Sequence, residues 1–256
     1  MRRLWPYRHL ILALTVREYQ VRYRQSFVGL LWAFILPLAT LGAGTLVFKE
    51  IAGVATEEDS YALSTLAALV PWSFFATALV FGVGSVVAQK GLVIKLAFPR
   101  QTLPLGMVGV SFVDLAISAG IYVVLAYLIG DGLPLTSLWV PILLTVEVAL
   151  VVGLVLLGSA ANVFARDIRL GIPLLVQLWL LLTPVLYPLS AVPLDLRPLY
   201  LANPMTGLVE SFRRVLLEGR NPDFGLMLIT LVWAVVGLTI GSWYFAATEK
   251  RFADVI

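Results

Sequence analysis

The stretch VREYQVRYRQSFVGLLWAFILPL, residues 16–38, joins a cluster of cations directly to an apolar run. Arg17, Arg22 and Arg24 precede a segment from Ser26 to Phe48 that contains no charged residue. Charged side chains need water or polar partners, whereas a long apolar run is stable only where water is excluded. The two halves of this stretch must therefore occupy two different environments that adjoin each other.

The composition identifies these environments as the surface and the interior of a membrane. Hydrophobic residues make up 60% of the 256 residues and charged residues only 13%, against about a quarter charged in soluble domains. The mean hydropathy is +0.95. The chain has no cysteine and a single histidine, His9, so we expect neither a catalytic site nor a metal site built on these residues. The cations flank apolar segments, and we therefore expect no nucleic-acid partner.

Six segments are long and apolar enough to cross a membrane, which takes about 20 predominantly apolar residues. They are residues 26–48, 61–87, 103–129, 139–162, 170–187 and 224–246. The fifth is the shortest and contains Pro173 and Pro184, which membrane helices tolerate where neighbouring helices or water satisfy the freed carbonyls. We predict an all-α integral membrane protein with six transmembrane helices in a single domain, residues 1–256.

The lysines and arginines are distributed unevenly between the two sides of the predicted bundle. With the N-terminus in the cytoplasm, thirteen of the 18 cations fall in inner segments and five in outer segments. Cytoplasmic loops of membrane proteins carry the excess of Lys and Arg. This asymmetry predicts a multi-pass protein of the cell inner (plasma) membrane with both termini in the cytoplasm.

Residues 5–24 have the pattern of an amphipathic helix that lies in the inner membrane surface. Leu12, Val16, Tyr19 and Tyr23 recur at helical spacing on one side. Arginines on the other side would meet anionic headgroups, at about 1 kcal/mol for each cation. The alternative is an ordinary basic flank of the first span, and the apolar stripe favours the interfacial helix.

Two predicted inner loops combine charged and apolar residues in a way that a simple solvent-exposed connection does not require. Residues 89–104, QKGLVIKLAFPRQTLP, mix cations with apolar residues and contain two prolines that interrupt helices. They predict either a short amphipathic element that docks on a cytoplasmic partner or the inner end of a long second span. Residues 162–171, NVFARDIRLG, form a loop too short to fold alone, but it can present charges to a partner.

The last outer connection contains a further short helix. Asn203–Pro204 predicts a turn into this helix and Gly219 its end, with Leu208 and Phe212 on one face. A re-entrant helix packed on the bundle and an amphipathic surface helix are both compatible with this pattern.

Two carboxylic acids lie inside predicted spans, Asp114 in the third and Glu147 in the fourth. Intramembrane carboxylates are costly and are candidates for function. No lysine, arginine or histidine occurs inside a span to pair with them, so we expect each to be neutral or hydrogen-bonded to serines or carbonyls. We weigh a structural role and a channel-lining role for both. In the last span, Gly237 and Gly241 offer a small surface for close helix packing.

Six stretches, in the same order along the chain, resemble the transmembrane subunits of ABC exporters for cell-surface polysaccharides. They are REYQVRYRQSFVGLLW, IKLAFPRQTLP, FARDI, PVLYP, NPMTGLVESFRR and EKRFADVI. The family exports O-antigen, capsule and teichoic-acid polymers, and the resemblance covers essentially the whole chain. It implies two copies of a six-span subunit, each bound to one cytoplasmic ATPase chain, that move a lipid-linked polysaccharide.

The resemblance also implies roles for particular residues. Residues 5–24, with Arg17 and Arg24, would be the interface helix, and Gly29 would lie in the turn that closes the inner gate. The family commonly has Leu–Gly at this turn, where the present chain has Val28–Gly29. Residues 189–219 would form short re-entrant gate helices. Contact with the ATPase would fall on Lys95, Phe98, Pro99, Arg100, Arg166 and Asp167.

Aromatic rings suit a path for sugars, because a pyranose stacks its C–H face on a ring without a fixed orientation. In the family that the chain resembles, aromatic rings line the sugar path, and we assign this role to Phe34, Trp179 and Tyr187. The alternative for each ring is a place at the membrane interface, where Trp and Tyr are enriched.

The chain contains no GxxxxGK[ST] phosphate-binding loop. We therefore expect a subunit that is not an enzyme and holds no cofactor, with ATP and magnesium on the partner. The expected partners are a second copy of the chain, two ATPase subunits, the lipid-linked polysaccharide and membrane lipids. Two alternatives remain: a secondary, ion-coupled transporter that uses Asp114 and Glu147, and an ABC exporter of small molecules or lipids.

Overall fold

The computed structural model describes residues 5–24, 31–46 and 58–255, and this part of the chain contains helices and no strand. The prediction of an all-α fold is thereby confirmed for the described residues. The α-helices are α1 (Arg8–Arg24), α2 (Leu31–Gly44), α3 (Glu58–Ala88), α4 (Lys90–Lys95), α5 (Thr102–Ile129), α6 (Val140–Phe164), α7 (Asp167–Leu181), α8 (Arg197–Ala202), α9 (Pro204–Leu216), α10 (Phe224–Thr248) and α11 (Phe252–Val255).

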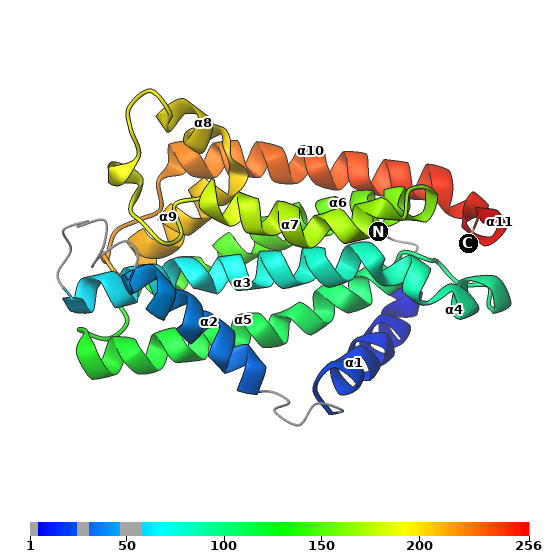
Figure 1. Cartoon of the computed structure of the whole chain (residues 1–256), viewed down its shortest axis with the longest axis horizontal. Coiled ribbons are helices and arrows are strands. Elements are labelled where there is room, and N and C mark those ends of the chain that lie inside the picture. The colour runs from blue at the N-terminus through cyan, green and yellow to red at the C-terminus, as the bar shows by residue number, and fades with distance from the viewer. Residues whose placement is uncertain (1–4, 25–30, 47–57, 256) are drawn as a thin grey trace.

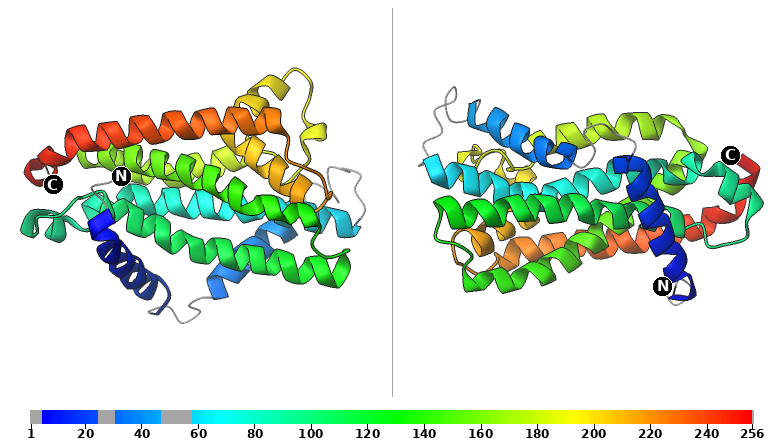
Figure 2. Two further views of the ribbon diagram at one scale, coloured as in Figure 1. Left: turned by 180° about the vertical axis from the view of Figure 1, so that it is seen from behind. Right: turned by 90° about the horizontal axis from the view of Figure 1, so that it is seen from below.

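The long helices lie side by side along the longest axis of the molecule (Figure 1). Helices α4 and α11 lie at one end, together with the C-terminus, and α8 lies near the other end. We call these the α4 end and the α8 end. Helix α1 runs obliquely to the bundle and contacts α5, as the two further views in Figure 2 also show.

Among the residues that the structure describes, four helical segments are long and apolar enough to cross a membrane. They are Tyr61–Ala88, Thr102–Ile129, Leu135–Phe164 and Phe224–Arg251, which correspond to the second, third, fourth and sixth predicted spans. Helix α2 lies within the first predicted span, 26–48, of which residues 26–30 and 47–48 are outside the described residues. Helix α7 ends at Leu181, before Pro184 of the fifth, because proline cannot donate to the helix ladder.

Helix α3 lies at the centre of the bundle and packs against α5, α6, α7 and α9. Glycines allow the closest helix contacts. A Cβ atom on Gly153 of α6 would overlap the backbone carbon of Gly237 in α10, and one on Gly241 would overlap the Gly153 carbonyl oxygen. The predicted close packing at Gly237 and Gly241 is thus present, and it joins two helices of the same chain.

A second hydrophobic core lies at the α4 end and gathers residues of seven helices. Leu14 of α1, Val93 of α4 and Phe252 of α11 are buried there against residues of α3, α5, α6 and α10. The predicted inner loop 89–104 consequently folds as a separate short helix, α4, followed by an irregular segment that leads into α5. Pro99 lies in this irregular segment and Pro104 in the first turn of α5. This core fixes the positions of the two predicted inner loops, 89–104 and 162–171.

Candidate functional site

Helix α1 is attached to the bundle by polar side chains on one face. Thr15 donates a hydrogen bond of 3.1 Å to the carbonyl of Gly106, and Gln89 donates one of 2.8 Å to Glu18. One turn further, Arg22 forms an ion pair of 2.8 Å with Asp114. Thr15, Glu18 and Arg22 follow the spacing that places residues on the same side of a helix.

The Asp114 carboxylate is fully engaged by two residues of α1. Its second oxygen accepts a hydrogen bond of 2.7 Å from the Tyr23 hydroxyl, and the Arg22 guanidinium lies 3.7 Å from the centre of the Phe81 ring. Burial, reinforced by the bond to Asp114, raises the pKa of the Tyr23 phenol to about 12.

The expectation that no cation pairs with the intramembrane acids is wrong for Asp114. The pairing partner, Arg22, belongs to α1. This helix lies outside the predicted spans, so the residues of the spans alone could not indicate it. Glu147 differs: it is completely buried in α6, and neither carboxylate oxygen has a hydrogen-bond partner among the described residues. The two acids therefore have unlike environments.

Helix α1 also turns a different face to the rest of the protein than its apolar stripe predicts. Leu12 and Val16 are 60% and 54% exposed, while Tyr23, predicted on their side, faces Asp114. Arg17 is exposed. The side chain of Arg24 and the whole of Gly29 lie outside the residues that the structure describes.

Most of the predicted coupling residues gather at the α4 end. Lys95 ends α4 and is exposed, as are Arg166 and Asp167 in the turn between α6 and α7. Phe98 packs against the second core, and Pro99 accepts a hydrogen bond from the Thr102 hydroxyl. The two inner loops thus stand on a common buried base and present charges outward.

Arg100 has a partner within the chain that the sequence did not indicate. Its guanidinium donates a hydrogen bond of 2.6 Å to the carbonyl of Glu249, at the point where α10 ends. The loop after α4 is therefore tied to the C-terminal segment. A comparable tie anchors the second loop, where the backbone N–H of Arg169 donates to the Asn162 side chain over 3.0 Å.

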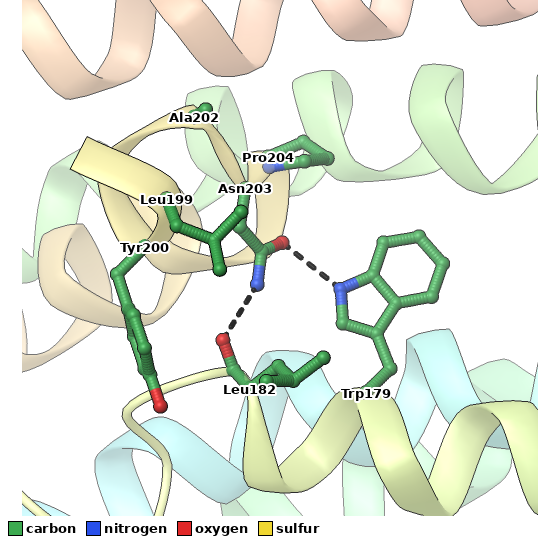
Figure 3. A pocket seen from close by; sticks show the side chains of 7 residues that line it. All are labelled: Trp179, Leu182, Leu199, Tyr200, Ala202, Asn203 and Pro204. Carbon is green, nitrogen blue, oxygen red and sulfur yellow. Dashed lines mark hydrogen bonds between the residues drawn. The ribbon is translucent and has the colours of Figure 1, made fainter. Parts of the chain in front are cut away.

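At the α8 end, a pocket of about 300 Å³ lies between the end of α7 and the start of α9. Trp179, Tyr200 and Asn203 line it together with four apolar residues (Figure 3). The Trp179 indole donates to the Asn203 oxygen, and the Asn203 amide donates to the Leu182 carbonyl. This is a pocket with two aromatic rings and one amide.

The other two predicted path residues stand in different surroundings. The Tyr187 and Tyr200 hydroxyls are 2.9 Å apart, so Tyr187 lies close to a residue that lines the Trp179 pocket. Phe34 is carried by α2 and is 38% exposed. The structure therefore brings Trp179 and Tyr187 to one region, and Phe34 belongs to another helix.

Arg213, one of the five cations assigned to the outer segments, is almost completely buried in α9. It donates to the carbonyls of Ser64 and Val185 and forms an ion pair of 2.8 Å with Glu210. Burial lowers the pKa of the guanidinium and Glu210 acts against this shift. An arginine within an otherwise apolar helix face was the signal that could have revealed this role. Within the described ranges, no group of three or more His, Cys, Asp or Glu residues gathers to hold a metal ion.

Comparison with known proteins covers almost the entire chain. Residues 9–217 match the ABC-2 type transporter family. The O-antigen export system permease protein RfbA of Myxococcus xanthus is 30% identical over 258 residues, which cover 100% of this chain and 98% of that protein. An RfbA from Klebsiella pneumoniae is 26% identical, with 96% and 95% covered. The polysialic acid transport protein KpsM of Escherichia coli is 23% identical, with 89% and 90% covered.

Proposed function

We propose, from the premise that the chain belongs to the ABC-2 type transporter family, that it is the membrane subunit of an ATP-driven polysaccharide exporter. In this proposal two copies form the conduit, and each binds one cytoplasmic ATPase chain that carries ATP and magnesium. The cargo is a polysaccharide on a lipid anchor, which moves outward from the cytoplasmic side. The full-length similarity to two O-antigen export permeases carries this proposal.

A six-span arrangement is part of the proposal. Helices α2 and α7 would supply the first and fifth spans beside the four long ones. The 15 residues of α7 extend only about 22 Å, against a hydrocarbon core of about 30 Å. The irregular segment 182–187 would complete the fifth crossing from within the bundle. The excess of cations at the α4 end supports a cytoplasmic location of that end and of both termini.

The α4 end would be the docking face for the ATPase. Lys95, Arg166 and Asp167 are exposed there on two loops that share one buried base. A push on either loop would be transmitted to several spanning helices, because α3, α5, α6 and α10 all contribute to that base. The tie from Arg100 to Glu249 would carry such a displacement to the last span.

The α8 end would hold the outer gate, with α8 and α9 as its short helices. Trp179 and Tyr200 face a pocket of about 300 Å³, and ring faces suit the passage of a sugar chain. Tyr187 and Phe34 remain proposed contacts along the same route.

Gentle extraction of a C-terminally tagged chain, followed by mass spectrometry of what co-purifies, tests the assignment. The proposal expects an ATPase chain in a ratio near one to one. A preparation that contains no ATPase and still transports in sealed vesicles would contradict it, and would direct attention to an ion-coupled carrier. A matched tag on a membrane protein of another family controls for adventitious binding.

A further inference from the structure

The ion pair between Arg22 and Asp114 lies far from either end of α5. Asp114 follows Thr102, the first residue of α5, by about 18 Å along a helix about 42 Å long. The side chains of the pair are only 18% and 12% exposed. A charged residue at such a depth is costly unless an opposite charge lies beside it.

The outward face of α1 is apolar. Leu12 and Val16 are more than half exposed, and so is Val21 at 51%. Thr15, Glu18 and Arg22 point the other way, toward α3 and α5. Such a helix is suited to a site with hydrocarbon on its outer side and protein polar groups on its inner side.

Packing alone holds only the first part of α1. Leu14 is buried, and the helix approaches α5 closely because Gly106 and Gly109 leave room for Leu14 and Thr15. Further along, the contacts are polar: Glu18 with Gln89, then Arg22 and Tyr23 with Asp114. The last turn of α1 is therefore held by the Asp114 carboxylate, with the Arg22 guanidinium lying against the Phe81 ring beside it.

We propose that Asp114 is the positioning residue that holds the C-terminal half of α1 inside the membrane against α5. Without the carboxylate, Arg22 loses its counter-charge at that depth, and α1 swings toward the inner surface, where phosphate groups of anionic lipids accept the guanidinium. Helix α1 then has two alternative positions, one docked on α5 and one at the inner membrane surface. Asp114 determines their relative populations. The consequence for transport, that the ATPase cycle must break this pair, rests on the proposed function; the docking itself does not.

Cysteine trapping measures the docked position directly, because the natural chain contains no cysteine. Val21 of α1 and Val110 of α5 line one pocket beside Arg22, in the half of α1 that the proposal concerns. The Val21→Cys/Val110→Cys chain is treated in native membranes with a short bis-methanethiosulfonate, which joins two nearby cysteines through disulfides, and unreacted thiols are counted by their mass shift with maleimide–polyethylene glycol.

The proposal expects Asp114→Asn and Arg22→Gln each to slow cross-linking at least tenfold. Asp114→Glu keeps the charge and retains most of the rate, and the exchange Arg22→Asp/Asp114→Arg restores it at least in part. Glu147→Gln is the matched control, a carboxylate-to-amide change in another span, and leaves the rate unchanged. Trapping of Asp114→Asn at the rate of the parent chain would overturn the proposal.

Two further readouts separate folding and transport from docking. If Asp114→Asn does not yield a monodisperse protein, Arg22→Gln carries the test, since it leaves α5 untouched; unchanged trapping in that variant overturns the proposal equally. With the co-purified ATPase, trapping is repeated with and without ATP. A rate unaffected by ATP contradicts the role in the cycle, whereas absence of any ATPase contradicts the proposed function and leaves the docking result standing.

Discussion

The indole N–H of Trp179 donates a hydrogen bond of 3.0 Å to the side-chain oxygen of Asn203, the residue that caps α9. The same oxygen accepts from the backbone N–H of Met205, and the amide donates to Leu182 and Thr183. One side chain thus joins the end of α7 to the start of α9. A second Trp–Asn pair, Trp139 with Asn221 at 3.1 Å, is exposed.

Replacement of Asn203 by alanine should destabilise the protein and loosen the α8 end. Loss of the cap alone costs about 1–2 kcal/mol, and the buried groups left without partners add to this. We expect the thermal midpoint in detergent to fall by about 4 °C or more. The exposed pair supplies the control, Asn221→Ala, which should shift the midpoint little. Equal falls in the thermal midpoint of both variants would show that the Asn203 hydrogen bonds stabilise the protein no more than the exposed Trp139–Asn221 pair does.

Gly153 should tolerate no side chain, because α6 and α10 touch through it. A Cβ there would overlap the backbone at Gly237, and backbone atoms cannot move aside as a flexible side chain can. We expect Gly153→Ala to lose at least about 2 kcal/mol of stability or to abolish folding. Gly120→Ala in α5 is the control, since a Cβ at Gly120 meets nothing within 4 Å. The yield of monodisperse protein and its thermal midpoint are the measurements.

Lysine should not fully replace Arg213. Its guanidinium reaches Glu210 and the carbonyls of Ser64 and Val185 at once, a fork that an ammonium group cannot reproduce. Because the residue is buried, Arg213→Met, which leaves Glu210 without its partner, should cost about 3–5 kcal/mol. Arg213→Lys should cost less, and still measurably.

The exposed pair of Arg220 with Glu218, 3.9 Å apart, provides the comparison for that series. Arg220→Lys should leave stability unchanged within error, as exposed ion pairs contribute little. Denaturant or thermal unfolding of the detergent-solubilised protein measures the loss of stability in the Arg213 variants and in Arg220→Lys. A fully stable Arg213→Met variant would show that the buried pair does not hold α9.

Arg100 and Asp167 test the proposed coupling. We expect Arg100→Ala and Asp167→Asn to leave ATP hydrolysis by the complex largely intact while export falls at least tenfold, because displacement of the inner loops no longer reaches the spans. Lys250→Ala removes an exposed cation near the same end and should change neither rate. Export at the normal rate in both loop variants would remove these residues from the coupling path.

The long apolar segments could be predicted from the sequence because hydropathy and length are local properties. Helices α3, α5, α6 and α10 appear where apolar runs predicted them, and Asn203–Pro204 does begin a capped helix. The partner of Asp114 could not be predicted, because it lies 92 residues away and joins the carboxylate only through the packing of α1 on α5. The apolar face of α9 could indicate that Arg213 is buried, but not its acceptors, which belong to α3 and to the segment after α7.

The Arg22–Asp114 contact also imposes an order on biogenesis. Helix α1 is synthesised before α5, and Arg22 cannot reach Asp114 until the chain has grown by a further 92 residues. During synthesis α1 must therefore remain at the membrane surface, with the Arg22 guanidinium among lipid headgroups. It can enter only after α5 has been inserted. A helix made before α3 and α5 is, on this account, one that reaches its place after them.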